Sequence, residues 1–307
     1  MTIAVVGSSN IDFAARVTSL PTPGQTVLAK KYSTGAGGKG CNQAVAVARL
    51  GVQPTFISKI GDDMLGNQLV ATLRAEGLDV ENMIIAPDIQ TGMALISIEE
   101  SGENMITVAG GANMTMTRED VNEKQDRLHG CDILMLQLEC PVIAIDCAMK
   151  HAREGGAKIM LDPAPVPDRV VLRDLMALTD IITPNVTECR AMTGILPEDA
   201  QTASEAAKII HEMGPATVII KMGGIGAFYS ADGQSDLIPA FNVTAIDTVG
   251  AGDSFNAGLA VALYKGQSLP DAVRFACASG ALATTRPGAA EAAPTLDQVT
   301  ALMDGTA

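Results

Sequence analysis

Short apolar runs along this chain alternate with segments in which apolar residues recur every three or four positions. The two periods predict buried strands and amphipathic helices, respectively. The expected strands are Ile3–Val6, Thr55–Ile60, Asp132–Leu138, Lys158–Leu161, Asp180–Thr183 and Thr217–Lys221. The expected helices include Val142–Arg153, Thr202–Met213, Pro270–Thr285 and a short last helix from Thr295. This alternation favours a doubly wound α/β fold, a mainly parallel sheet with helices on both faces.

A second group of extended segments does not fit the alternating pattern. Gln25–Ser33 is extended and mostly polar, and the runs Thr91–Glu99 and Asn104–Ala109 flank the turn-forming residues Glu100-Ser101-Gly102-Glu103. The two flanking runs predict a β-hairpin. We expect this hairpin and the Gln25–Ser33 strand to form a small sheet apart from the main one.

Two glycines precede a strongly helical pattern near the end of the chain. Ile246 and Asp247 are expected to close an extended segment, after which Gly250 and Gly252 permit a tight turn. Phe255, Leu259 and Leu263 follow at spacings of four, which predicts a helix.

The start of that helix is a candidate for chemistry. Its first N–H groups have no intrahelical acceptor and favour an anion. Asp253 lies in the first turn, so a carboxylate base would stand beside an anion site, the pair that phosphoryl transfer requires. The alternative is that Asp253 only stabilises the helix dipole.

A second glycine-rich segment, Gly35–Asn42, is expected to be a loop that opens a helix from Gln43 to Leu50. It matches G-x-G-x-x-G, but a dinucleotide-binding turn follows a buried strand, and Lys30–Thr34 is too polar for one. Gly40 after Lys39 also excludes a phosphate-binding P-loop, which needs Ser or Thr there.

Polar or special residues follow most of the expected strands. In open α/β sheets the carboxyl ends of the strands form the ligand-binding edge. Each such residue taken alone also fits a cap or an Asx turn. The strand-end residues are Asn10 and Asp12 in a loop, Glu139, Asp162–Pro165, Asn185 with Glu188, and Gly223–Gly226.

The amino-acid composition limits the kinds of molecule that this chain is expected to bind. The net charge of the 307 residues is -14 and no Lys/Arg-rich run occurs, which argues against nucleic acid or a membrane as partner. Six cysteines without a C-x-x-C pair and three scattered histidines give no zinc spacing. We expect reduced, buried thiols, a cytoplasmic protein, and neither a signal peptide nor a membrane span.

Taken together, these segments resemble the PfkB family of sugar and nucleoside kinases, also called the ribokinase family, over essentially the whole length. The segments that carry the resemblance are Gly7–Asp12, Pro21–Gly24, Gly37–Ala44, Gly61–Asp63, Asp180–Glu188 and Asp247–Gly258. The resemblance implies one ribokinase-like α/β domain over residues 1–307, with a β-sheet lid from about 11–34 and 90–110. It also implies transfer of the γ-phosphate of ATP to a sugar hydroxyl, which for ribose is the 5-hydroxyl.

The resemblance also implies roles for matched residues. Asp253 would be the general base, Gly250, Ala251 and Gly252 the anion hole, and Glu188 would act on Mg²⁺ and the phosphates through water. The sugar contacts would be Asn10, Asp12, Gly38, Lys39, Asn42, Glu139 and Asp253. The nucleotide site would comprise Asn185, Glu188, Lys221, Met222, Gly223, Gly224, Ile225, Gly226, Gly252, Asp253 and Cys277. Cys277 stands at a position where the family often has a polar residue.

Members of this family also bind a monovalent cation beside the anion hole. The matched positions are Asp247, Val249, Ala283, Arg286, Gly288 and Ala292. Ala292 stands where a serine hydroxyl is usual, so we expect K⁺ activation with weakened affinity. The alternative is that Asp247 fixes the turn by itself. Apolar side chains on both faces of Met93–Ile96 further suggest a homodimer formed through the lid.

Other functions stay open at this point. Within the family, the sugar could be another pentose, a deoxypentose or a nucleoside. An NAD-dependent oxidoreductase rests only on the Gly35–Gly40 match. A non-catalytic sugar sensor would tolerate the loss of Asp253, which this chain keeps.

Overall fold

A computed structural model describes residues 2–99 and 103–306 of the chain. Within these residues the main sheet has eight strands in the order β14-β13-β12-β11-β10-β9-β1-β4. The six strands β12, β11, β10, β9, β1 and β4 run parallel to one another. Strand β13 runs antiparallel to both of its neighbours, β12 and β14. The bounds are β1 Ile3–Val6, β4 Thr55–Ile57, β9 Ile133–Leu136, β10 Lys158–Leu161, β11 Ile181–Ile182, β12 Thr217–Lys221, β13 Gly226–Ala231 and β14 Gln234–Pro239. The expected mainly parallel α/β sheet is confirmed.

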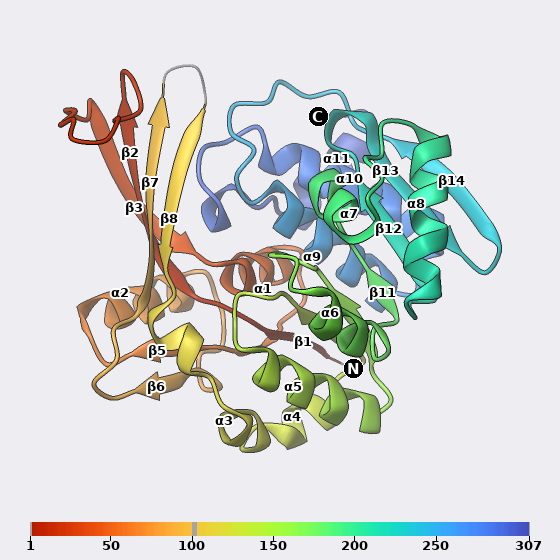
Figure 1. Ribbon diagram of the computed structural model, residues 1–307, viewed down its shortest axis with the longest axis horizontal. Helices are drawn as coiled ribbons and strands as arrows, with labels where there is room; N and C mark the ends of the chain where they lie inside the picture. Colours follow the sequence, from red (N-terminus) through yellow and green to blue (C-terminus); the bar gives the residue numbers. More distant parts are fainter. Residues whose placement is uncertain (1, 100–102, 307) are drawn as a thin grey trace.

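Helices cover both faces of the main sheet (Figure 1). Alternate side chains of a strand point to opposite faces, so Ile3 and Val5 pack with α1, α9 and α10, whereas Ala4 and Val6 pack with α5. The bounds are α1 Lys39–Arg49, α2 Met64–Ala75, α3 Arg118–Asn122, α4 Gln125–His129, α5 Val142–Glu154, α6 Arg169–Met176, α7 Val186–Thr193, α8 Ala200–Glu212, α9 Ala251–Tyr264, α10 Leu269–Ala283 and α11 Leu296–Met303. In the described part of the chain, no helix combines the length and apolar character that crossing a membrane requires.

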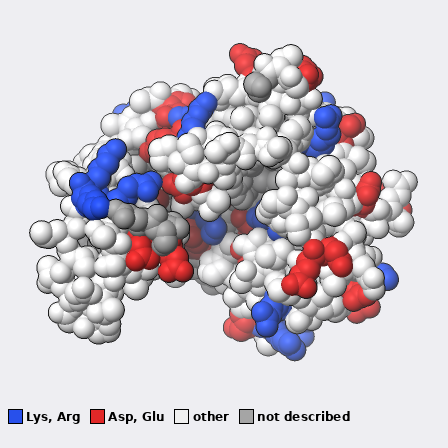
Figure 2. Space-filling view, turned by 90° about the horizontal axis from the view of Figure 1, so that it is seen from above, with Lys and Arg blue, Asp and Glu red and all other residues white. Residues whose placement is uncertain are grey.

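A separate four-stranded sheet, here called the side sheet, stands beside this body (Figure 1). Its strand order is β3-β2-β7-β8, with bounds β2 Asn10–Val17, β3 Lys31–Gly37, β7 Gly92–Glu99 and β8 Asn104–Ala109. The antiparallel β7–β8 pair confirms the expected hairpin strands, while Glu100, Ser101 and Gly102 of its turn lie outside the described residues. Between the side sheet and the body the surface is hollowed, and acidic and basic side chains reach this hollow (Figure 2).

The structure corrects two expectations at the start of the chain. Asn10 and Asp12 lie in β2 and not in a loop, because β2 pairs with β3 on one side and with β7 on the other. Only Lys31–Ser33 of the expected Gln25–Ser33 strand is extended, and β3 continues to Gly37. The expected glycine loop is therefore a strand end followed at once by α1, which is possible because Gly38 adopts φ 85.

Three further differences from the sequence-based expectations concern which segments form strands. The expected Thr55–Ile60 strand is divided at Ser58 into β4 and β5 (Lys59–Gly61), and β5 pairs with β6 (Ile84–Ala86) in a small sheet of its own. Ile246 and Asp247 do not form a strand, because their N–H groups both donate to the carbonyl of Thr284. The β13–β14 hairpin was not expected from the sequence.

Candidate active site

The carboxylate of Asp253 is buried in the first turn of α9. It accepts hydrogen bonds from Asn42 Nδ2 at 2.9 Å and from Gln43 Nε2 at 3.1 Å, both on α1. Burial raises the pKa of Asp253, and the attraction of Lys39 opposes that rise. Gly250 precedes the helix at φ 73, and a Cβ there would lie 2.9 Å from the Cα of Ala289. The turn thus requires glycine and leaves the first N–H groups of α9 beside a fixed carboxylate.

The buried side-chain oxygens that lack a hydrogen-bond partner within the described residues include Oδ1 of Asp12 and Oδ1 of Asn42. Gly37 makes room for the first, since a Cβ on it would lie 2.1 Å from Asp12 Oδ1. Buried polar atoms are normally paired, and an unpaired one costs roughly 1–3 kcal/mol. Both oxygens are therefore suited to accept hydrogen bonds from the hydroxyl groups of a ligand.

The electrostatic surroundings of Asp12 are unusual. Burial first, and then the charges of Glu291, Glu139 and Asp253, raise its pKa to about 7. The pKa of Lys39 is also raised, chiefly by the attraction of Asp253 and against the effect of burial, so Lys39 stays charged. The site therefore combines a cation with several carboxylates, of which Asp12 changes charge near neutral pH.

The other expected sugar contacts lie around the start of α1. Glu139 Oε2 accepts hydrogen bonds from Lys39 N at 3.1 Å and from Ser8 Oγ at 2.5 Å. Asn10 Oδ1 accepts from Asn113 Nδ2 at 2.9 Å. Gly38, at the N-cap of α1, lies against the backbone of Ser8 and Asn10. The structure thus brings together all the residues expected to contact a sugar.

A cavity of about 610 Å³ lies next to the first turn of α9 and is lined by Lys221, Gly252 and Cys277 among others. This volume is within the usual range of small-molecule sites. Lys221 Nζ is 3.0 Å from Asp162 Oδ1, and a Cβ on Gly252 would lie 3.6 Å from the same nitrogen. A cationic group therefore faces the turn expected to hold an anion. Burial raises the pKa of the Cys277 thiol to about 12, so it remains protonated.

Asn185 and Glu188 do not line this cavity, although Asn185 forms a β-bridge with Lys221, which does. The polar atoms of both residues have a local use. They form a capping box at the start of α7, in which Asn185 Oδ1 accepts from Glu188 N at 2.9 Å and Glu188 Oε2 accepts from Asn185 N at 2.8 Å. Burial raises the pKa of Glu188, Lys221 opposes this and Asp162 adds to it, so the three charges interact. Met222 and the turn Gly223–Ile225 lead from β12 to Gly226, the first residue of β13.

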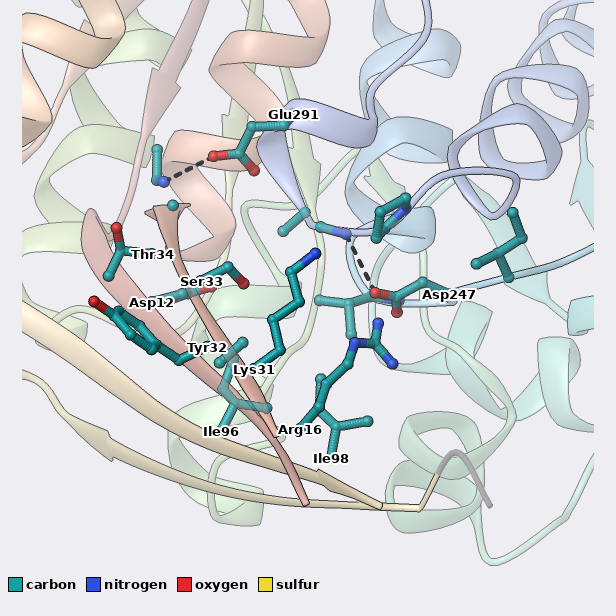
Figure 3. A pocket seen from close by; sticks show the side chains of 18 residues that line it. Asp12, Arg16, Lys31, Tyr32, Ser33, Thr34, Ile96, Ile98, Asp247 and Glu291 are labelled. Atoms are coloured by element: carbon teal, nitrogen blue, oxygen red, sulfur yellow. Dashed lines mark hydrogen bonds between the residues drawn. The ribbon is translucent and has the colours of Figure 1, made fainter. Parts of the chain in front are cut away.

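Two of the residues expected to hold a cation, Val249 and Gly288, donate backbone hydrogen bonds to a third, Asp247. Asp247 Oδ1 accepts from Val249 N at 3.0 Å, and Oδ2 accepts from Gly288 N at 3.2 Å (Figure 3). These bonds agree with the alternative that Asp247 fixes the turn, yet each carboxylate oxygen keeps a further lone pair. Ala283 and Ala292 are buried, and Arg286 is exposed. Carboxylate and carbonyl oxygens suit a hard cation such as K⁺.

Two residues of the site, Gln43 and Glu291, were not among the expected ones, and a third, Asp162, was expected only as a strand-end residue without a role. Gln43 is fully buried and bonds to both Asp253 and Asp162, the latter at 3.3 Å. Glu291 Oε1 accepts from Ala36 N at 3.1 Å and lines a cavity of about 560 Å³ with Asp12 (Figure 3). Asp162 was signalled by its place at a strand end, and Gln43 by its neighbour Asn42, but nothing in the sequence marks Glu291.

Comparison with known proteins decides the family. Residues 2–296 match the model of the pfkB family carbohydrate kinases. The chain belongs to the pfkB family of carbohydrate kinases. Ribokinase of Haemophilus influenzae is 40% identical over 96% of this chain and 95% of that protein, and deoxyribokinase of Salmonella typhi is 30% identical over 97% of each. The solved structure of Arabidopsis thaliana ribokinase complexed with ribose and ATP has a TM-score of 0.88 at 30% identity, covering 98% of both chains.

Membership of the carbohydrate kinases removes the basis of the oxidoreductase alternative. In this pfkB-family chain Gly35 and Gly37 end β3, an edge strand of the side sheet. A dinucleotide-binding turn instead follows a central strand of the main sheet. The G-x-G-x-x-G match is therefore coincidental. Gly35 leaves room for Glu291, Gly37 for Asp12, and Gly40 for the backbone of Gly7.

Proposed function

We propose that this chain phosphorylates D-ribose at its 5-hydroxyl with ATP, giving ribose 5-phosphate and ADP. The observation that carries the proposal is the buried carboxylate of Asp253, held by Asn42 and Gln43 in the first turn of α9. The similarity to ribokinases over nearly the whole chain supports ribose as the sugar.

In the proposed reaction Asp253 takes the proton of the 5-hydroxyl as that oxygen attacks the γ-phosphorus. The bond from the γ-phosphorus to the bridging oxygen breaks, and ADP leaves with the electron pair. The raised pKa of Asp253 favours its role as base, since a stronger base removes the proton more readily. A positioned base of this kind contributes roughly 10²–10⁴-fold to the rate.

Charge on the transferring group is expected to be stabilised by the N–H groups at Gly250–Gly252 and by Lys221. The ammonium of Lys221 is fixed by Asp162 against the same turn. Mg²⁺ bound to the nucleotide would neutralise phosphate charge. Glu188 and Asp162, whose charges interact with each other, would order its water ligands. Positioning and charge stabilisation of this sort are most of what phosphoryl transfer needs.

On the sugar side, the unpaired oxygens of Asp12 and Asn42 are expected to accept hydrogen bonds from ribose hydroxyls. A site built for a hydroxyl discriminates against an analogue that lacks it. The similarity to a deoxyribokinase keeps 2-deoxyribose as the second candidate.

The test is a panel of ribose, 2-deoxyribose, other pentoses and a nucleoside with ATP, scored by ADP release and by phosphorus NMR of the product. Ribose should give the highest kcat/KM and a 5-phosphate. A higher kcat/KM for another member of the panel, or a phosphate at another carbon, would contradict the proposal.

Three associated features belong to the same proposal. K⁺ would be held by Asp247 and by carbonyls near Val249, Ala283, Arg286 and Gly288, outside the reaction itself. The side sheet would close over the sugar as a lid and pair two copies as a homodimer, supported by exposed Leu95, Ile106 and Val108. The six free, buried cysteines accord with a cytoplasmic enzyme.

A further inference from the structure

Two of the three histidines of the chain meet at the ends of two helices far from the site just described. His129 ends α4, and His151 and Glu154 lie three residues apart in the last turn of α5. One ligand atom from each residue lies within 4.8 Å of the others. The two helices pack together (Figure 1). Each leads into the amino end of a strand, α4 into β9 and α5 into β10, whereas the proposed reaction uses the carboxyl ends of the strands.

The orientation of His151 is fixed by Asn122. The ring nitrogen Nε2 lies 2.8 Å from Asn122 Oδ1, and the thiol of Cys147 donates to the same oxygen at 3.2 Å. Since this oxygen only accepts, Nε2 carries the hydrogen, and Nδ1 presents a lone pair. Nδ1 is buried and has no hydrogen-bond partner among residues 2–99 and 103–306.

The atom that faces this lone pair is also an acceptor. Glu154 Oε2 lies 3.7 Å from His151 Nδ1 and 3.3 Å from His129 Nε2. In a tetrahedral site with bonds of about 2.0–2.1 Å, neighbouring ligand atoms are about 3.4 Å apart. Both distances are close to this value, so a cation bound to all three atoms would give the lone pair of His151 Nδ1 a partner and would replace the hydrogen bond between His129 Nε2 and Glu154 Oε2.

We propose that His129, His151 and Glu154 bind a divalent transition-metal ion, with Zn²⁺ as the natural occupant. Two imidazoles and one carboxylate are a common set of three protein ligands for Zn²⁺, with water in the fourth position. Glu154 is 67% exposed and His129 38% exposed, which leaves that fourth position open to solvent.

Three independent features favour a cation here. Asn122 supplies the outer hydrogen bond that metal-ligating histidines usually make. The carboxyl ends of α4 and α5 carry partial negative charge. The net charge of the chain, -14, adds a long-range attraction. Because the ion would join α4 to α5 and touch no residue of the kinase site, its effect would be on stability and not on turnover.

The test uses untagged, metal-free protein titrated with Co²⁺, whose tetrahedral complexes absorb strongly in visible light, and then with Zn²⁺ in competition. We expect one equivalent of Co²⁺ to bind with this absorption, Zn²⁺ to displace it, and Zn²⁺ to raise Tm by a few degrees with kcat unchanged. His129→Ala and His151→Ala should each weaken binding by at least roughly 100-fold, and Asn122→Ala by about 10-fold. His211→Gln is the matched control, because His211 bonds to Pro215 and Ser230 away from the cluster.

Two results would overturn the site. One is Co²⁺ binding that is absent, or equal in wild type and in the His129 and His151 variants. The other is a Tm that His151→Ala lowers by the same amount with Zn²⁺ as with a chelator, which would mean that the cluster is only an ion pair. Glu154→Gln, at an exposed position, keeps the test valid if a histidine variant fails to fold.

Discussion

Asp12 gives the most quantitative prediction, because its pKa of about 7 in the free protein lies far above the ordinary 3.8. Burial and three neighbouring carboxylates cause the rise, so the carboxyl of Asp12 is neutral below about pH 7 and charged above it. A carboxylate accepts hydrogen bonds from sugar hydroxyls better than a neutral carboxyl group does. Ribose should therefore bind more tightly as pH rises through neutrality.

The size of the effect follows from the titration. With a pKa of about 7, the ionised fraction of Asp12 increases from about one tenth at pH 6 to about nine tenths at pH 8. If ribose binds only the ionised form, its association constant increases about tenfold over this interval. Binding near pH 7 should also release about half a proton, which calorimetry detects in buffers of different ionisation enthalpy.

The assay is calorimetric titration of ribose without ATP in the wild-type background, because replacing Asp253 would remove one of the charges that raise the pKa of Asp12. Asp12→Asn in that background should abolish the pH dependence and weaken binding. Asp297→Asn, at an exposed position on α11, should change neither. An affinity that does not vary with pH, or a tenfold rise that survives in the Asp12→Asn variant, would refute the reasoning.

Three further outcomes are expected. Lys221→Met should lower kcat by roughly 10²–10³ with ribose affinity unchanged. The control Lys208→Met, on the exposed face of α8, should have no effect. Equal kcat in both variants would show that Lys221 does not act at the phosphoryl site. At constant ionic strength, ribose phosphorylation should be faster in K⁺ than in tetramethylammonium. Ala292→Ser should lower the half-saturating K⁺ concentration. Equal rates in the two salts would mean that Asp247 has only a structural role. Ile106→Lys, on the exposed strand β8, should give a monomer by light scattering, and an unchanged dimer would exclude the side sheet as the interface.

The spacing of apolar residues predicted the strands of the main sheet well, because these strands are buried on both faces. Lys158–Leu161 and Thr217–Lys221 are strands with the bounds expected from the sequence. Strand β2 was missed, since the polar residues Asn10 and Asp12 interrupt the apolar pattern that marks a buried strand. Its pairing with β3 and β7 depends on residues up to 82 positions away, which no local pattern records.

The residues of the candidate site likewise fall into those that local sequence patterns predicted and those that they did not. Local motifs marked Asp253, Asn42 and Lys39, because a glycine turn before a helix is visible in a short stretch of sequence. Glu291 was invisible, since its partner Ala36 is 255 positions away. The pairing of His129 with His151 likewise needs the packing of α4 on α5, so linear spacing gave no metal signal.

The central claim, that Asp253 is the base of a sugar kinase, is tested most directly by single-turnover kinetics of Asp253→Asn with ribose and ATP. The variant should bind both substrates with nearly wild-type affinity and lose roughly 10²–10⁴ in kcat. Asp271→Asn is the matched control, because Asp271 is an exposed acid in the first turn of α10 and should leave kcat unchanged. An Asp253→Asn variant that keeps half of the wild-type kcat would contradict the account and reduce Asp253 to a helix-start acid like Asp271.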